Sequence, residues 1–114
     1  MSSIDTNQLE WMGMKVNGIF SKDLLSHENG TFKMVRLEPQ AKYPIHQHPD
    51  KTEFAYVLEG VLEASIGEKI YTGEPGAFLT FPVGTKHGLH NPTDKETVVL
   101  IGAVKDSLDS SDDK

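Results

Sequence analysis

Three histidines and one glutamate are the residues of this chain whose types and spacing could do chemistry. His46 and His48 are one residue apart, so on an extended strand their side chains point to the same face. Glu53 follows after four residues, a gap that suits a short turn and a return on the neighbouring strand. Imidazole and carboxylate groups that converge on one point form a transition-metal site. The sequence therefore predicts a metal site, to which the fold must also bring the distant His87.

The elements that must position these residues are short strands. Stretches rich in β-branched and aromatic residues recur at intervals of roughly 8–12 residues, separated by glycine, proline and asparagine, and no helical periodicity is present. This pattern is typical of an all-β sandwich or barrel. A hairpin turn is expected over residues 26–30, where Asn29-Gly30 is a strong hairpin signal. The expected strands cover residues 19–25, 31–38, 43–48, 53–59, 61–66, 70–72, 77–81, 86–91 and 96–104.

Composition limits the classes of protein to consider. The 114 residues predict one domain, and the absence of cysteine removes disulfides and thiolate ligands. The net charge is −6 without a basic patch, so nucleic acid is not an expected partner. No apolar run is long enough for a membrane span and no secretory signal is visible, so we expect a cytoplasmic protein. We predict a domain over residues 1–105 and an acidic disordered tail over residues 106–114.

The spacing around the first cluster resembles the first motif of the cupin superfamily, Gly-x5-His-x-His-x3-4-Glu-x6-Gly. His46, His48, Glu53 and Gly60 fit this pattern. The leading glycine is replaced by Gln40. If the turn at this position needs a positive φ, the glutamine is strained there.

The second cupin motif, Gly-x5-Pro-x-Gly-x2-His-x3-Asn, is matched throughout. Fifteen residues, 61–75, separate the two motifs, so the resemblance extends over residues 39–91. A finer likeness of residues 11–48 is to small single-domain cupins similar to ChrR-type sensor domains and diketone-cleaving dioxygenases. The residues that match the second motif are Gly76, Pro82, Gly84, His87 and Asn91.

The resemblance implies an RmlC-like double-stranded β-helix, or jelly-roll barrel. It also implies that His46, His48, Glu53 and His87 are the ligands of one divalent transition metal ion. Four ligands in an octahedral shell leave two positions for water, dioxygen or a chelating substrate. Iron, manganese, nickel and zinc are all compatible with this ligand set.

Other residues that could take part in a site have plainer interpretations. His90 is an odd number of residues from His87, so a regular strand turns it to the opposite face, away from a metal. His27 lies in the expected hairpin turn and should be solvated. Asn91 is interpreted as a turn former before a proline, and Trp11 as a packing residue at the mouth or edge of the barrel.

Strand alternation also predicts an assembly. If Glu53 points into the barrel, Ala55 and Val57 do so too, and the opposite face of that strand is also apolar. A strand that is apolar on both faces is normally covered on both, which predicts a homodimer through the outer face. The alternative is that residues 9–14 cover this face within one chain. The residues expected to face outward are Phe54, Tyr56 and Leu58.

Two functions fit these features. The first is a metal-dependent, dioxygenase-like enzyme of the iron type acting on a small chelating substrate. The second is a non-catalytic module that senses a small ligand or a metal. Isomerase or lyase chemistry would need a further acid or base, and none stands out. Arg36 is either a solvated strand residue or, if it turns inward, a clamp for a substrate carboxylate, and Tyr43 or Tyr56 could lie near the pocket.

Overall fold

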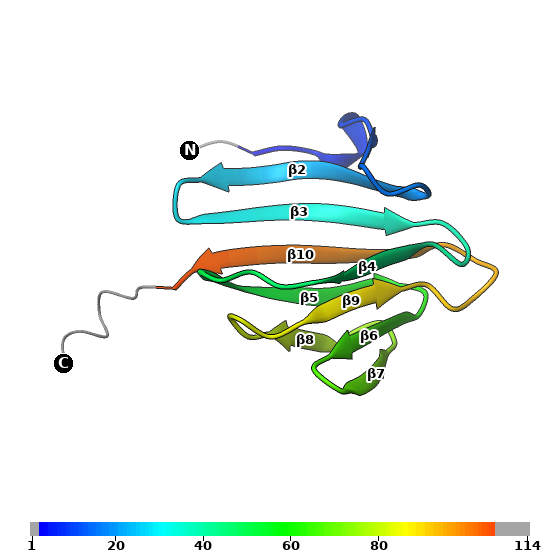
Figure 1. Cartoon of the computed structure of the whole chain (residues 1–114). Helices are drawn as coiled ribbons and strands as arrows, with labels where there is room; N and C mark the ends of the chain where they lie inside the picture. Colours follow the sequence, from blue (N-terminus) through cyan, green and yellow to red (C-terminus); the bar gives the residue numbers. More distant parts are fainter. Residues whose placement is uncertain (1–2, 107–114) are drawn as a thin grey trace.

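The computed structural model describes residues 3–106, which form β-strands, one three-residue 3-10 turn (η1, Thr6–Gln8) and no α-helix (Figure 1). Each expected strand is present, with ends within two residues of those predicted, and one further short strand, β1, precedes them. The strands are β1 Met12–Gly13, β2 Ile19–His27, β3 Gly30–Leu37, β4 Lys42–His46, β5 Lys51–Glu59, β6 Leu62–Ile66, β7 Lys69–Gly73, β8 Phe78–Phe81, β9 His87–His90 and β10 Thr97–Lys105.

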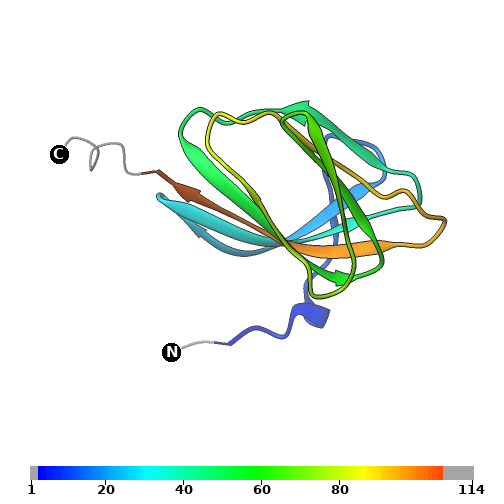
Figure 2. The same ribbon diagram turned by 90° about the horizontal axis from the view of Figure 1, so that it is seen from below.

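The strands form two antiparallel sheets that face each other (Figure 2). The larger sheet has the order β1-β2-β3-β10-β5-β8 and the smaller one the order β4-β9-β6-β7. Strands distant in sequence therefore lie side by side, as β10 does between β3 and β5. This arrangement is the jelly roll that the sequence predicts.

Alternation along the strands places one face of each sheet in a common core. In β5, Ala55 and Val57 are fully buried, whereas Tyr56 and Leu58 are 40% and 39% exposed on the outer face. The predicted orientation of the two faces of β5 is therefore confirmed. The core consists of Ile19, Val35, Leu37, Ala55, Val57, Leu62, Ala64, Phe81, Leu89 and Val99.

An aromatic row crosses the outer face of the larger sheet. The ring of Phe54 lies 6.3 Å from that of Phe32 on β3 and 5.5 Å from that of Phe78 on β8, measured between ring centroids. Between β3 and β5, the row passes over Gly102 of β10, where an added Cβ would overlap the Phe54 ring. Glycine at this position therefore lets an aromatic side chain cover the neighbouring strand.

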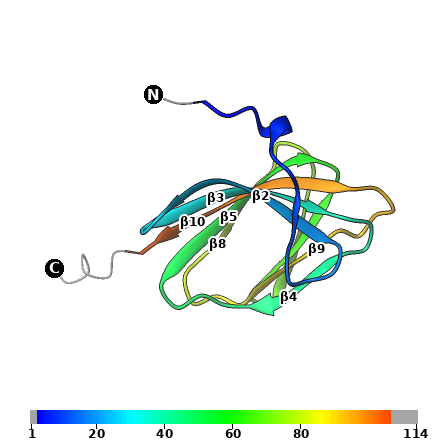
Figure 3. The ribbon, with the colours of Figure 1, turned by 90° about the horizontal axis from the view of Figure 1, so that it is seen from above.

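The N-terminal segment lies at the far edge of the larger sheet (Figure 3). Strand β1 pairs with β2, and Trp11 lies beneath the charged groups of Lys22 and Arg36, 4.5 and 4.9 Å from its ring centroid. Three strands separate β1 from β5. The alternative that residues 9–14 cover the outer face of β5 is therefore wrong, and Met14 of this segment packs against the core instead.

Two details at the ends of elements differ from expectation. The hairpin between β2 and β3 turns at Glu28 and Asn29, and Gly30 already pairs with His27 as the first residue of β3. The turn is where the sequence placed it, but Asn-Gly does not form its centre. Asp106, the first residue of the predicted acidic tail, donates its N–H to the Asp50 carbonyl, and residues 107–114 of that tail lie outside the described residues.

The turn before β4 needs the backbone conformation that the first motif normally assigns to glycine. Gln40 has a φ of 65°, the left-handed region that side chains rarely adopt. Its side-chain amide donates a 2.9 Å hydrogen bond to the Thr93 carbonyl. The loop ahead of His46 is thus held in shape even though its glutamine is strained.

Replacement of Gln40 separates the backbone strain from the side-chain bond. Gln40→Ala and Gln40→Gly both remove the bond to Thr93, but only glycine relieves the positive φ. We expect the glycine variant to have a free energy of unfolding about 1 kcal/mol higher than the alanine variant, measured by urea denaturation. Equal stability of the two variants would mean that this turn is not strained.

Candidate metal centre

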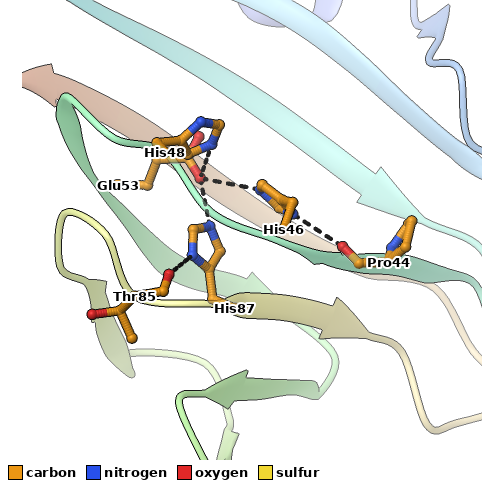
Figure 4. Close-up of polar contacts among 6 residues, drawn as sticks. All are labelled: Pro44, His46, His48, Glu53, Thr85 and His87. Atoms are coloured by element: carbon orange, nitrogen blue, oxygen red, sulfur yellow. Dashed lines mark hydrogen bonds and ion pairs between the residues drawn. The ribbon is translucent and has the colours of Figure 1, made fainter.

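The fold brings the four predicted site residues to one point between the sheets (Figure 4). His46 ends β4, His48 lies in the loop that follows, Glu53 is on β5, and His87 opens β9. One potential ligand atom from each lies within 4.8 Å of all the others. The Glu53 Oε1 atom is 2.9 Å from Nε2 of His87, 3.3 Å from Nε2 of His48 and 3.8 Å from Nε2 of His46.

A β-bulge in β4 turns the side chain of His46 toward the interior. Tyr43 pairs with Leu89 and His46 pairs with His87, so three steps along β4 match two steps along β9. The extra residue falls near Pro44, which has no N–H to give to a ladder and is commonly found at bulges. Without the bulge, Tyr43 and His46 would point to opposite faces, whereas here both line the interior with ring centroids 5.0 Å apart.

Backbone carbonyls orient two of the imidazole rings. Nδ1 of His46 lies 3.0 Å from the Pro44 carbonyl oxygen, and Nδ1 of His87 lies 3.0 Å from that of Thr85. A carbonyl oxygen only accepts hydrogen bonds, so Nδ1 donates in both rings and Nε2 faces Glu53. This is the arrangement in which histidines present Nε2 to a metal ion.

The electrostatics of the cluster favour a cation at its centre. Burial alone would raise the pKa of the Glu53 carboxyl, but the hydrogen bond from His87 and the nearby imidazoles outweigh it and lower that pKa. Burial likewise opposes the charge on His87, yet its bonds to Glu53 and to the Thr85 carbonyl raise its pKa. The pKa values of both groups are thus shifted toward their charged forms, and Nε2 of His87 lies 2.9 Å from Oε1 of Glu53.

His48 differs from the other two histidines. Burial is the main cause of its lowered pKa, and the positive charge of Lys51 adds to the effect, so its imidazole tends to remain neutral. Its Nε2 is buried without a hydrogen-bond partner among the described residues. A buried polar atom of this kind costs free energy unless something binds it.

The donor set and its spacing fit a divalent transition metal. Two donors at right angles around such an ion, each about 2.1 Å from it, lie about 3.0 Å apart. The distances of 2.9 and 3.3 Å from Glu53 Oε1 to His87 and His48 are close to that value. The cluster could therefore hold a metal ion, which would give the unpartnered Nε2 of His48 a ligand role.

The cluster opens onto a cavity of about 290 Å³ between the sheets. Glu53 is the one carboxylate among the described residues that line it, and Lys33 and Lys51 are its other charged residues. Neither lysine is among the site residues predicted from the sequence. Lys33 is two residues from the inward-facing Val35 on β3, and Lys51 is two residues from the inward-facing Glu53 on β5. Strand alternation alone could therefore have predicted that both lysines face inward. The apolar wall includes Ile19, Val35, Leu37, Phe81, Leu89 and Ile101.

Comparison with protein families identifies the chain. A family model described as "Cupin domain" matches residues 33–102, which is more than half of the sequence and includes the whole cluster. The chain belongs to the cupin family. A comparison of this cupin with curated proteins gave no match.

Solved structures share the fold over nearly the full length of this cupin. KdgF from Halomonas sp. is 20% identical with a TM-score of 0.84, and the match covers 96% of this chain and 98% of that one. A predicted oxalate decarboxylase from Thermotoga maritima is 18% identical with a TM-score of 0.82, covering 91% and 99%. An RmlC-like cupin from Shewanella frigidimarina is 18% identical with a TM-score of 0.81, covering 94% and 93%. These likenesses show the small RmlC-like jelly roll.

Three of the other candidate residues lie away from the cluster of this cupin. His90 faces the opposite side of β9, as predicted, and its Nδ1 lies 3.1 Å from Glu63 Oε1. His27 is exposed at the end of β2. Tyr56 also faces outward, so of the two tyrosines only Tyr43 lines the cavity. Within residues 3–106 there is no helix with the length and apolar character that a membrane crossing requires.

Arg36 matches neither of its two sequence interpretations. It faces outward between the rings of Trp11 and Phe20, 4.9 and 4.5 Å from their centroids, with Glu96 at 3.8 Å. Its side chain is only 22% exposed, so it is not simply solvated. It is also on the wrong face to bind a substrate in the cavity. Trp11 packs at the sheet edge, as predicted.

Asn91, the last residue of the second motif, has a structural role. Its side chain is fully buried, and Nδ2 donates to carbonyls of residues 37–38 and of Lys95. Its Oδ1 accepts from the backbone and the hydroxyl of Thr93. These bonds tie the turn after β9 to the end of β3 and confirm the interpretation as a turn former.

Removal of this amide should destabilise the fold. Asn91→Ala would leave several buried carbonyls without a donor, and we expect a loss of about 3 kcal/mol in the free energy of unfolding, measured by chemical denaturation. Asn91→Asp should also destabilise, because a carboxylate cannot donate. Asn29→Ala, at the exposed hairpin turn, is the control and should change stability by less than about 0.5 kcal/mol. A similar effect at both positions would contradict this role.

Proposed function

We propose that this cupin is a metal-dependent enzyme of the dioxygenase type that acts on a small chelating substrate. In this proposal His46, His48, Glu53 and His87 hold one divalent iron, manganese, nickel or zinc ion, with iron as the ion for oxygen chemistry. The observation that carries the proposal is that four donor atoms within 4.8 Å of one another face a cavity large enough for a small molecule.

The residues around the cluster have distinct tasks in this proposal. The carbonyls of Pro44 and Thr85 hold two imidazole rings with Nε2 directed at the ion. Burial lowers the pKa of His48, which favours the neutral ring that a metal ligand must have. The apolar walls limit water around the reacting groups. When bound, the metal supplies open coordination positions and redox chemistry.

The comparisons support a small oxygen-rich substrate. One structural neighbour is described as a predicted oxalate decarboxylase, and oxalate is a small chelating anion. Another is the polyketide cyclase RemF from Streptomyces resistomycificus, 18% identical with a TM-score of 0.81. Proteins described with different chemistry thus share this fold.

Metal content and oxygen uptake test the proposal. The wild type, stripped with a chelator and reloaded with iron(II), should bind one metal ion per chain and consume oxygen with a member of a panel of diketones, thiols and catechols. His48→Ala should reduce metal content at micromolar metal by at least about tenfold and abolish uptake. His90→Ala is the matched control and should change neither, since His90 lies on the other face.

Three results would count against the proposal in different ways. No metal uptake by the wild type would remove its basis. Equal loss in His48→Ala and His90→Ala would show that the cluster is not the binding site. Metal and ligand binding without oxygen consumption would favour the non-catalytic sensor module instead.

We also propose that two copies of the chain associate through the outer face of β5, β8 and β10. Tyr56, Leu58 and Phe78 are 40%, 39% and 58% exposed there, and Glu59 at the end of β5 is the one charged outward residue of these three strands. A second copy suits this face, because an apolar surface with a charge only at its edge can pair with its twofold copy with little repulsion, whereas the chain as a whole carries a charge of −6.

Light scattering at micromolar concentration tests the dimer. We expect the wild type to have about twice the 12.6 kDa mass of one chain. The double variant Leu58→Arg, Phe78→Arg should be monomeric. Ile70→Arg, at an apolar residue 69% exposed on the other sheet, should remain dimeric. A monomeric wild type, or dissociation by Ile70→Arg alone, would contradict the proposal.

A further inference from the structure

Two lysines stand on the inner wall of the larger sheet beside the metal cluster. Lys33 on β3 and Lys51 on β5 both line the 290 Å³ cavity. Each interrupts an inward face that is otherwise apolar or part of the cluster, since Val35 follows Lys33 and Glu53 follows Lys51 at the next inward position. A lysine is rarely turned toward a core without a partner for its charge.

The strand register places the two lysines on either side of the glutamate. Lys51 is the inward residue next to Glu53 along β5. Lys33 pairs with Ile101 of β10, which in turn pairs with Ala55 of β5. Lys33 therefore lies two strands away from β5, level with Ala55, which is the next inward residue after Glu53. With strands about 4.8 Å apart, its backbone is on the order of 10 Å from that of β5. Its long side chain can cover much of that distance.

Neither lysine has a carboxylate partner within residues 3–106. No ion pair within 4.0 Å joins either ammonium group to an acidic side chain, although Asp23 is the register neighbour of Lys33 on β2. Glu53 is the single carboxylate on the cavity wall, and His87 already pairs with it. Lys51 also borders a second hollow of about 160 Å³ that Glu28 and Asp50 line, again without an ion pair.

The cavity therefore has an excess of positive charge. With a divalent ion at the cluster, the two ammonium groups and one carboxylate leave a net charge of about +3 inside a cavity whose other walls are mostly apolar. Such a site attracts an anion, because like charges concentrated in a cavity raise the local positive potential. A volume of about 290 Å³ corresponds to the room of roughly ten water molecules, which suits a small organic molecule.

We propose that Lys33 and Lys51 determine specificity for a small carboxylate substrate, whose chelating oxygens face the metal cluster while its carboxylate pairs with the two ammonium groups. This inference rests on the proposed metal site. It assigns to these two lysines the role that the sequence had offered to Arg36, which faces the other side of the sheet.

Calorimetry with two matched probes tests the inference. The first probe is 4,6-dioxoheptanoate, a β-diketone that carries a carboxylate tail, and the second is its neutral methyl ester. Nickel(II)-loaded protein is used, so that binding is measured without oxygen chemistry. The wild type should bind the acid about tenfold or more tightly than the ester, as expected for a carboxylate paired with lysine in a shielded site.

Substitutions assign that preference to residues. Lys33→Gln and Lys51→Gln should each reduce the preference for the acid to less than about threefold while retaining full nickel content, since neither lysine belongs to the cluster. Lys69→Gln, at an exposed position of β7, is the matched control and should retain the preference of the wild type.

The possible outcomes distinguish a failure of the lysine inference from a failure of the proposed metal site. A wild type that takes up no metal would overturn the proposed function and this inference together. Full metal content with equal affinity for acid and ester would overturn the inference alone. A preference that survives in both lysine variants, or that is lost equally in Lys69→Gln, would also overturn it.

Discussion

The structure depends on one electrostatic constraint, the convergence of electron-rich atoms on a single point. Nε2 atoms of His46, His48 and His87 are directed at Oε1 of Glu53, over distances of 2.9 to 3.8 Å. Lone pairs that face one another at this range repel unless a cation lies between them. The hydrogen bond between Glu53 and His87 meets that need in part, and the unpartnered Nε2 of His48 shows that the need is not fully met. A metal ion would satisfy all four groups.

Several features of the fold hold the four side chains in this arrangement. The bulge in β4 turns His46 inward, the carbonyls of Pro44 and Thr85 orient two rings, and Asn91 anchors the turn that follows β9. Because these supports come from the backbone and from a buried amide, they are insensitive to the identity of surface residues. The outer face of the larger sheet takes no part in holding the cluster, and its row of aromatic side chains is suited to the proposed contact between two copies of the chain.

The strands and the cluster could be predicted because they depend on regular features. Alternation with period two decides which side of β5 carries Glu53 and which carries Tyr56, and the structure agrees. Irregular features could not be predicted in the same way. The bulge near Pro44 reverses the alternation and brings Tyr43 inward, and the stacking of Arg36 on Trp11 depends on a segment whose pairing has no sequence pattern. Lys33 was predictable from its alternation with Val35, but a lysine is ordinarily assumed to face solvent.

A crystal structure of the protein grown with manganese(II) or iron(II), with anomalous data at the metal edge, tests whether the four side chains bind one metal ion. We expect a single anomalous peak about 2.0–2.3 Å from Nε2 of His46, His48 and His87 and from a carboxylate oxygen of Glu53. A structure without a peak between these four side chains, or with a peak bound by other residues, would contradict it.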